Sequence, residues 1–178
     1  MAMITEEDRL REYENIKEIL DELDVAAEIL HIGDESEMSC MMISLPTEVE
    51  DWREEFKTDL HMATAYLIQL SEDQEQLTKY LMVYVPVQVD LRETDELAVL
   101  RLINQINNTL AVGTCFYGKE PTSERMLLQL KWMIGGRVDE NLDEGVVCEA
   151  IYELGATYDR LKAQLLELAG GSAGCSEE

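Results

Sequence analysis

The chain has 178 residues, a length that favours one domain over two. Hydrophobic residues make up 46% and charged residues 29%, a composition typical of a globular protein. With 38 Asp and Glu against 14 Lys and Arg, the formal net charge is −24, and a field of that sign repels phosphate backbones and anionic lipid headgroups. Nucleic acids and membranes are therefore disfavoured as partners, and so is an anionic substrate without a local basic pocket.

The cysteines and the N-terminus predict a cytoplasmic, bacterial-type protein with reduced thiols. Cys40, Cys115, Cys148 and Cys175 are too far apart for a C-x-x-C pair or a zinc ribbon. We expect the first three to be small buried hydrophobic residues, and Cys175 to lie in a polar tail. The N-terminus has no cationic start followed by an apolar run, and no apolar run approaches the roughly 20 residues of a membrane helix.

The first predicted helix covers residues 5–24. Thr5 can cap its N-terminus, and Asp8 three residues later resembles the second half of a capping box. The predicted apolar stripe consists of Leu10, Tyr13, Ile16, Leu20 and Leu23. The acids on the opposite side are interpreted as a solvated face, made of Glu12, Glu14, Glu18 and Glu22.

Two hairpins are predicted next. Residues 25–32 and 38–45 are apolar runs separated by a polar turn that contains Gly33, and Pro46 ends the second strand. The polar stretch 47–59 is predicted as a short amphipathic helix or an ordered loop.

The second hairpin pairs residues 60–70 with 77–89. Its second strand is apolar on both sides, as expected of a central strand, and Pro86 predicts an edge segment or a bulge.

A middle helix is predicted to begin at Thr94 or Asp95. Its predicted buried stripe consists of Leu97, Leu100, Ile103, Ile106 and Leu110. A third hairpin follows, with strands at 112–117 and 125–134, and Gly135-Gly136 is expected to break its second strand.

The last helix, predicted over residues 142–169, carries the strongest pattern in the sequence. Asp139 or Asn141 can cap it, Gly170-Gly171 is expected to end it, and residues 171–178 are expected to form a disordered tail. The apolar positions step by four and three residues, which is typical of a straight seam. They are Val147, Ile151, Leu154, Tyr158, Leu161, Leu165 and Leu168.

Together these elements predict an α+β fold. A mostly antiparallel sheet built of hairpins is flanked by an N-terminal helix, a middle helix and a long C-terminal helix. Because no Pro- or Ser-rich linker divides the chain, we expect one domain over residues 1–170.

The sequence carries no recognisable catalytic motif. Neither His31 nor His61 has a neighbour at metal-ligand spacing, and there is no nucleophile elbow, phosphate-binding loop or dinucleotide fingerprint. Carboxylates are so numerous that a pair of them indicates nothing by itself. We therefore predict a protein that is not an enzyme, with no catalytic, cofactor-binding or metal-binding residues and no cofactor.

The methionines and aromatic residues of the strands have two interpretations. They fill the core, or they form a soft apolar docking surface, since flexible Met side chains adapt to varied partners. The residues of the possible partner-binding or dimer surface are Met41, Met62, Met82, Tyr84, Leu128, Leu130 and Trp132.

Residues 102–165 show a helix with an Asn-rich end (102–108), a strand opening at 112–116, a strand with alternating Leu128, Leu130 and Trp132, and a long closing helix. This arrangement resembles the YbjN family, whose fold is similar to that of the type III secretion chaperones of the Tir-chaperone type. Asn107 and Gly113 match the pattern best, whereas residues 47–59 do not align.

The resemblance implies a compact, usually dimeric fold without catalytic machinery. Secretion chaperones of this shape bind an unfolded stretch of an effector along apolar patches, and YbjN proteins are linked to the regulation of motility and stress responses. We therefore expect a non-enzymatic, cytoplasmic, chaperone-like protein-binding or regulatory domain that forms a homodimer and captures an apolar segment of an unknown protein partner. The alternatives are a dedicated type III secretion chaperone for an effector, and a small-molecule sensor or unrecognised enzyme.

Overall fold

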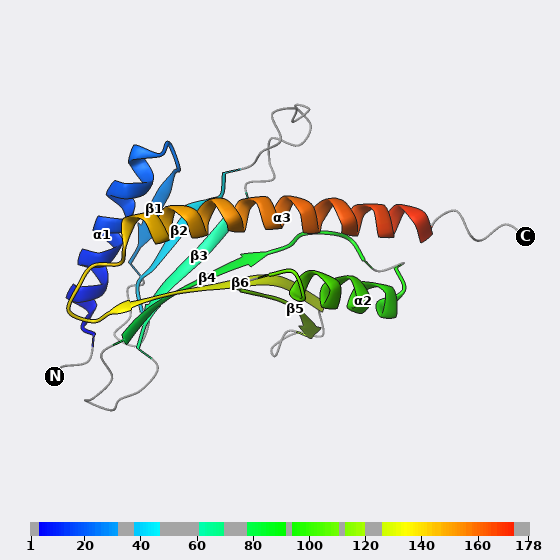
Figure 1. The fold of residues 1–178 in the computed structure, drawn as a ribbon, viewed down its shortest axis with the longest axis horizontal. Helices are drawn as coiled ribbons and strands as arrows, with labels where there is room; N and C mark the ends of the chain where they lie inside the picture. Colours follow the sequence, from blue (N-terminus) through cyan, green and yellow to red (C-terminus); the bar gives the residue numbers. More distant parts are fainter. Residues whose placement is uncertain are drawn as a thin grey trace, which may run out of the picture.

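The computed structural model describes residues 4–31, 38–46, 61–69, 78–91, 94–110, 113–119 and 126–172. The elements are, in order, α1 (Glu6–Glu22), β1 (Ala27–Leu30), β2 (Cys40–Ser44), β3 (Met62–Ile68), β4 (Thr78–Pro86), α2 (Glu96–Asn107), β5 (Thr114–Lys119), β6 (Met126–Arg137) and α3 (Glu144–Ser172). Six strands form one antiparallel sheet in the order β1-β2-β3-β4-β6-β5, and the long α3 crosses it (Figure 1). The predicted α+β class and the placement of the three helices are confirmed.

The start and the buried stripe of α1 agree with prediction. The Thr5 hydroxyl oxygen accepts a hydrogen bond from the Asp8 amide (3.1 Å), and the Asp8 carboxylate accepts one from the Thr5 amide (3.1 Å), which completes a capping box. Tyr13, Ile16 and Leu20 are fully buried. The predicted solvated face is wrong in one place, because Glu12 is buried while the other three acids of that face are exposed.

Tyr13 ties α1 to the sheet at two points. Its hydroxyl donates a hydrogen bond to the Ser39 carbonyl oxygen (3.1 Å) and accepts one from the Leu67 amide (2.7 Å). Burial raises the pKa of Tyr13 to about 12, so the hydroxyl stays protonated and keeps its donor at all physiological pH values. The first helix is thereby fixed over β2 and β3.

All three predicted hairpins are present as antiparallel pairs, β1–β2, β3–β4 and β5–β6. The central position predicted for β4 is confirmed, since it pairs with β3 on one side and β6 on the other. Pro86 does not mark a bulge, and it lies where β4 pairs only with β6, because the pairing of β4 with β3 ends at Tyr84. It is the last residue of β4, where its missing N–H costs no hydrogen bond within the strand, and the next amide, of Val87, donates to the Leu128 carbonyl (2.8 Å). The prediction for residues 47–59 lies outside the described residues.

The two glycines expected to break β6 lie inside it. Gly135 pairs with Tyr80 and Gly136 with Lys79, and the strand continues to Arg137. A Cβ atom at Gly136 would lie 2.5 Å from Cδ2 of Leu142. The glycine is therefore a point of close approach between β6 and the segment that leads into α3. A strand tolerates a glycine where another side chain needs the space.

The buried stripe of α2 differs from the predicted one. Asp95 caps the helix by accepting from the Leu97 amide (3.1 Å), as predicted, but Leu97 and Leu100 are 52% and 38% exposed. Consecutive steps of three residues drift around a helix by about 60° each, whereas steps of four and three stay on one side. The buried residues follow the second pattern: Val99, Ile103 and Ile106.

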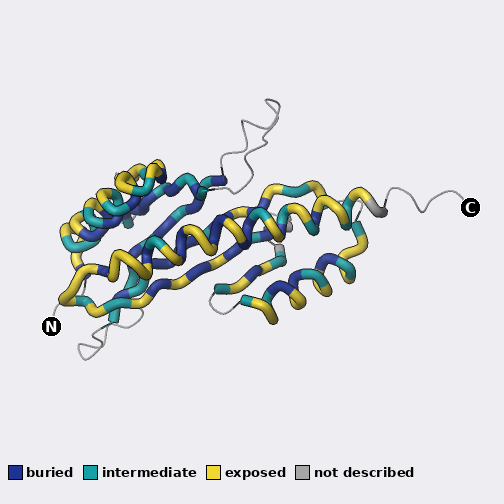
Figure 2. The backbone as a smooth tube through the Cα atoms, turned by 45° about the horizontal axis from the view of Figure 1, so that its top comes forward, coloured by how far each residue is buried: buried dark blue, intermediate teal, exposed yellow. Residues whose placement is uncertain are grey.

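The seam of α3 is confirmed, with six of its seven residues buried and Leu168 half-buried (Figure 2). The helix begins two residues later than predicted and continues through Gly170 to Ser172. Asp143 takes the capping role expected of Asp139 or Asn141, because its carboxylate accepts from the Val146 amide (3.0 Å) and its carbonyl from the Val147 amide (3.0 Å).

Gly155, in the middle of α3, lies against the chain that leaves β2. A Cβ atom at this position would overlap the carbonyl oxygen of Pro46. We expect Gly155→Ala to lower the free energy of unfolding by roughly 1–3 kcal/mol through overpacking, despite a gain of about 1 kcal/mol in helix propensity. Gly170→Ala is the matched control, since that position has no atom within 4 Å and should show only the gain. Urea unfolding measures both, and equal stabilisation by the two substitutions would contradict the close contact.

The core lies on one face of the sheet. Along β3 and β4 the inward residues alternate with outward ones, and the inward residues join a single cluster with side chains of α1, α2 and α3. No outward residue of the described strands belongs to that cluster. All described helices thus contribute to the layer on one side of the sheet. None of these helices combines the length and apolar character needed to cross a bilayer.

Candidate functional site

The seven residues predicted as a partner or dimer surface are divided between the two faces of the sheet. Four of them point inward and are buried in the core beneath the helices: Met41, Leu128, Leu130 and Trp132. In the monomer these four are not at the surface. Met62, Met82 and Tyr84 point to the opposite side, which we call the outer face; Met62 and Tyr84 are half-buried there, and Met82 is buried at 5% exposure.

The outer face is the side of the sheet that turns away from the core cluster. Its members are the outward residues of the six strands, and most are Met, Tyr or other apolar residues. They are Glu28, Leu30, Cys40, Met42, Ser44, Met62, Thr64, Tyr66, Ile68, Thr78, Tyr80, Met82, Tyr84, Pro86, Thr114, Phe116, Gly118, Leu127, Gln129, Lys131, Met133, Gly135 and Arg137.

The register aligns these side chains in rows across the strands. Met82 of β4 lies opposite Tyr66 of β3 and Met133 of β6. The next row places Tyr84 between Thr64 and Lys131. Neighbouring residues in such rows have Cβ atoms about 5 Å apart, so the side chains form one continuous surface rather than isolated spots.

Several contacts order this surface. The rings of Tyr66 and Tyr84 meet edge to face with centroids 6.1 Å apart, and the ammonium of Lys131 lies 5.9 Å from the Tyr84 centroid. Burial raises the pKa of Tyr66, which keeps its hydroxyl protonated. Towards the sides of the sheet the surface is more open, with Met133 42% and Phe116 52% exposed.

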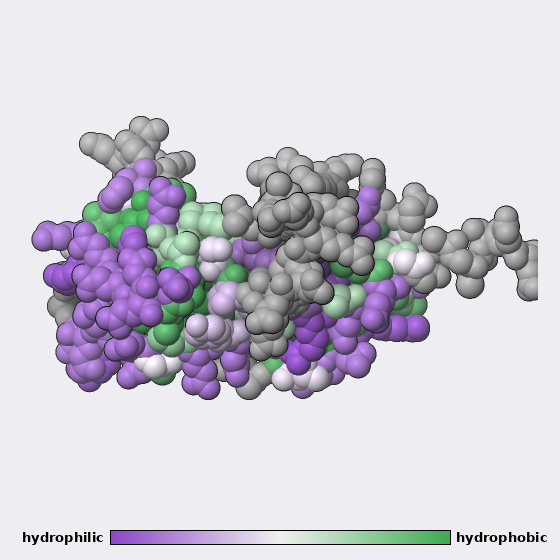
Figure 3. All heavy atoms as spheres, turned by 90° about the horizontal axis from the view of Figure 1, so that it is seen from above, coloured by the Kyte–Doolittle hydropathy of each residue, from purple (hydrophilic) through white to green (hydrophobic). Residues whose placement is uncertain are grey.

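The outer face is nearly free of charge. Among its described residues the charged side chains are those of Glu28, Lys131 and Arg137. Arg137, at the end of β6, is engaged by Asp139 (2.8 Å) and Glu140 (3.1 Å) of the following turn. Elsewhere the acids dominate, and the end of the molecule at which α1 lies is covered by hydrophilic residues (Figure 3). A mostly apolar face with few charged residues therefore exists on a chain of net charge −24.

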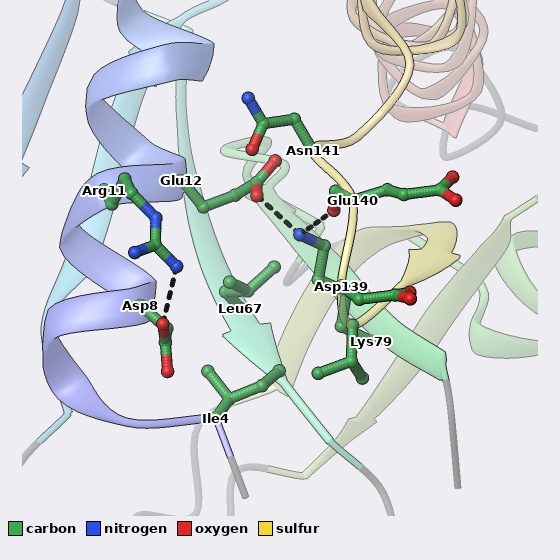
Figure 4. Close-up of a pocket in the computed structure, with 10 residues that line it drawn as sticks. Ile4, Asp8, Arg11, Glu12, Leu67, Lys79, Asp139, Glu140 and Asn141 are labelled. Atoms are coloured by element: carbon green, nitrogen blue, oxygen red, sulfur yellow. Dashed lines mark hydrogen bonds and ion pairs between the residues drawn. The ribbon is translucent and has the colours of Figure 1, made fainter. Parts of the chain in front are cut away.

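A second candidate site is a polar cavity of about 260 Å³ between α1, β4 and the turn before α3 (Figure 4). Its lining residues are Ile4, Asp8, Arg11, Glu12, Leu67, Lys79, Val138, Asp139, Glu140 and Asn141. The volume lies below the roughly 300–1,000 Å³ of typical small-molecule pockets.

Two buried side chains form the wall of this cavity. Glu12 and Lys79 are only 3% and 4% exposed, and Nζ of Lys79 lies 2.5 Å from Oε2 of Glu12. The same ammonium donates to the Glu140 carbonyl (2.6 Å), and the other carboxylate oxygen of Glu12 accepts from the Leu142 amide (2.7 Å). The pair joins α1, β4 and the chain entering α3, so we interpret it as a structural clamp.

One sequence signal could have revealed the clamp. Lys79 lies in an apolar strand, at an even spacing from Leu81 and Val83, so its side chain points inward as theirs do. A buried lysine requires an acidic partner. Glu12 gave no comparable signal, because one more acid on an acidic helix does not stand out.

The histidines and cysteines are placed as follows. His31 is exposed, and His61 is buried with its ring 4.4 Å from that of Tyr158. Cys40 and Cys115 are buried, as expected, and burial raises the pKa of both thiols, that of Cys115 to about 12. Cys148 is half-buried rather than buried. In the part of the chain described, His, Cys, Asp and Glu do not gather in groups of three that could hold a metal ion.

Asn107 and Gly113, the positions that carry the family resemblance best, have structural roles. The Asn107 side chain donates to the Cys115 carbonyl (3.0 Å) and accepts from the Cys115 amide (2.7 Å), as a neighbouring strand would. Gly113 has a φ of 95°, and a Cβ there would lie 2.5 Å from the Trp132 ring. Asn107 thus attaches α2 to the outer edge of β5 and occupies that edge at Cys115.

No protein-family model matches the sequence, and comparison with curated proteins gives no match. The resemblance to the YbjN family stays a prediction.

Proposed function

We propose that this chain is a non-enzymatic protein-binding or regulatory domain, similar to YbjN proteins and type III secretion chaperones, that acts in the cytoplasm and captures an apolar segment of a protein partner on the outer face. One observation carries the proposal: the outer face is mostly apolar with few charged residues, it lies outside the core cluster, and the whole chain has a net charge of −24.

The composition of the outer face supports binding rather than simple solvation. An antiparallel sheet with one face in water alternates apolar inward residues with polar outward ones. In β3 and β4 the outward positions include Tyr66, Ile68, Tyr80, Met82 and Tyr84. Tyrosine provides large contact area with a polar tip, and methionine adapts its shape to a partner, so both suit a recognition surface.

The face is a better binding surface than the sheet edges. At one edge, β5 is engaged at Cys115 by the Asn107 side chain. At the other edge, β1 has only four residues and carries the charged Glu28. Short and charged edge strands are poor templates for adding another strand. Capture on the face also uses the apolar area, which strand addition would leave exposed.

The experiment compares three baits in a lysate of the source cells: the wild type, Met133→Glu on the outer face, and Val146→Glu on α3. Met133 and Val146 are similarly exposed, at 42% and 47%, so both variants should fold, which circular dichroism checks. We expect a protein that is retained by the wild type and Val146→Glu but lost with Met133→Glu.

Calorimetry with that purified partner should show a negative heat-capacity change and a Kd raised about tenfold or more by Met133→Glu, since a charge is placed in an apolar contact. Equal binding to both variants would place the interaction elsewhere and contradict the proposal. A gain in thermal stability with a metabolite instead of a protein would favour the small-molecule sensor.

A further inference from the structure

We infer that the outer face receives an amphipathic α-helix of the partner, which lies across the strands with a cationic side chain at one end and a carboxylate at the other. The inference rests on the proposed function, because both use the outer face, and it specifies the chemistry of the captured segment. Three features carry it: a row of residues with opposite charges towards its two ends, the lack of free backbone groups on a sheet face, and the match between helix pitch and strand spacing.

One row of the outer face, which we call the central row, crosses all six strands. Strand pairing aligns one residue from each strand in the order Glu28, Met42, Thr64, Tyr84, Lys131 and Thr114. Glu28 and Lys131 are four strand spacings apart, about 19 Å. Both are exposed, and neither has an ion-pair partner within the part of the chain that the structure describes. Both charges are therefore available to a binding partner.

An exposed apolar side chain lies beside each of these two charges. Leu30 follows Glu28 by two residues on β1 and is 38% exposed, and Met133 follows Lys131 by two residues on β6 and is 42% exposed. Because β1 and β6 run in the same direction, Leu30 and Met133 lie on the same side of the central row, where Met82 is the neighbour of Met133. A partner that fits this surface has an apolar side with one charge at each end.

A helix suits a sheet face better than an extended segment does. The backbone N–H and C=O groups of the strands bond to neighbouring strands, so the face offers side chains alone to a partner. An extended segment laid on this face buries backbone groups that find no hydrogen-bond partner, and each of them carries a cost in free energy. A helix pairs these groups internally. The captured segment is therefore helical, in contrast to the unfolded stretch that secretion chaperones bind.

The dimensions of a helix agree with those of the face. One helical turn rises about 5.4 Å and adjacent strands are about 4.8 Å apart, so a helix across the strands presents about one turn to each strand. A side chain returns to nearly the same side of a helix after 11 or 14 residues, which is about 16.5 or 21 Å. These two lengths bracket the roughly 19 Å between Glu28 and Lys131. A cation and a carboxylate at this spacing on the partner can therefore pair with both residues.

Fluorescence anisotropy with a synthetic helix measures this contact in the full-length protein. The probe is a capped, labelled peptide of about 20 residues, with leucines along one side and a Lys and a Glu two heptads apart at its ends. We expect Glu28→Lys and Lys131→Glu each to raise the Kd about tenfold, because each replaces an attraction with a repulsion. In the double variant the two charges are exchanged, so the peptide binds after turning by 180° and its Kd returns to within about twofold of the wild-type value.

The matched control is Glu18→Lys, which makes the same charge change as Glu28→Lys at an exposed position of α1. It should leave the Kd unchanged, which separates the effect of the row from that of net charge. The same peptide with two central prolines cannot form the helix and should bind at least about tenfold more weakly. Circular dichroism checks the fold of each variant. If a reversed charge prevents folding, Glu28→Gln and Lys131→Gln remove the charges instead, each with an expected effect of about threefold.

A wild type that does not bind the helical peptide at about 100 µM would overturn the inference. So would charge reversals without effect, a double variant that stays weak, or equal binding of the proline peptide. Each of these results leaves the capture of a partner standing, because that proposal depends on the loss of a cellular partner with Met133→Glu. A peptide that behaves as expected, while Met133→Glu loses no cellular partner, would support this inference and contradict the proposed function.

Discussion

Replacing Lys79 with methionine should lower the free energy of unfolding by about 3–5 kcal/mol, because it leaves the buried carboxylate of Glu12 without its cation. The amide of Leu142 still donates to Glu12, but one neutral donor does not compensate a buried charge. Urea unfolding monitored by circular dichroism measures the loss.

The control is the exposed pair of Lys17 and Asp21 on the same helix, whose charged atoms are 2.6 Å apart. Lys17→Met should cost less than about 0.5 kcal/mol, since exposed pairs separated by one helical turn contribute little. Combining Lys79→Met with Glu12→Leu should recover most of the stability, because no buried charge then remains. A Lys79→Met protein as stable as the wild type would show that the clamp contributes nothing.

Leu154→Glu should abolish the folded state, which is the largest effect that we expect of a single substitution. Leu154 is fully buried at the middle of the α3 seam, and a carboxylate there has no cation in the core cluster to pair with. The lost packing of a buried leucine costs about 2–5 kcal/mol and the unpaired buried carboxylate several kcal/mol more, so the sum reaches the range of 5–15 kcal/mol that holds a typical domain folded.

Tyr152→Glu is the matched control, two residues away on the same helix and 47% exposed. It should stay folded with nearly unchanged stability. Circular dichroism and urea unfolding distinguish the two variants. If Leu154→Glu kept its fold and only lost self-association, the α3 seam would be an interface between subunits and its assignment to the core would be wrong.

The spacing of apolar residues correctly predicted the helices and strands that bury only one side. The α3 seam runs in regular steps of four and three residues, and six of its seven positions are buried. The hairpins followed from apolar runs separated by polar turns. In α2 two apolar patterns overlap, and the prediction followed the wrong one. It used the leucines at steps of three, whereas the buried residues are Val99, Ile103 and Ile106. The glycines of β6 gave a false strand end because their function, space for Leu142, depends on a contact that local sequence does not show.

The candidate site was only partly predictable. Met and aromatic residues were chosen as candidates because of their residue type. The face of the sheet that each one occupies depends instead on its position in the alternation of side chains along the strand. Leu128, Leu130 and Trp132 share the parity of the core, whereas Lys131 and Met133 on the same strand face outward. Glu12 could not be recognised, since its partner is 67 residues away in the sequence and one acid among many carries no signal.

The order of the strands has a consequence for the synthesis of the protein on the ribosome. β4 ends at Pro86, but its second neighbour, β6, begins only at Met126 and reaches the last paired residue at Arg137. At 5–20 residues per second, the roughly 50 residues between them take several seconds to synthesise. During that interval the first four strands are available while the inner edge of β4 has no partner, and an unpaired apolar edge invites pairing with other chains. The nascent chain therefore needs protection longest at the strand that ends up in the middle of the finished sheet.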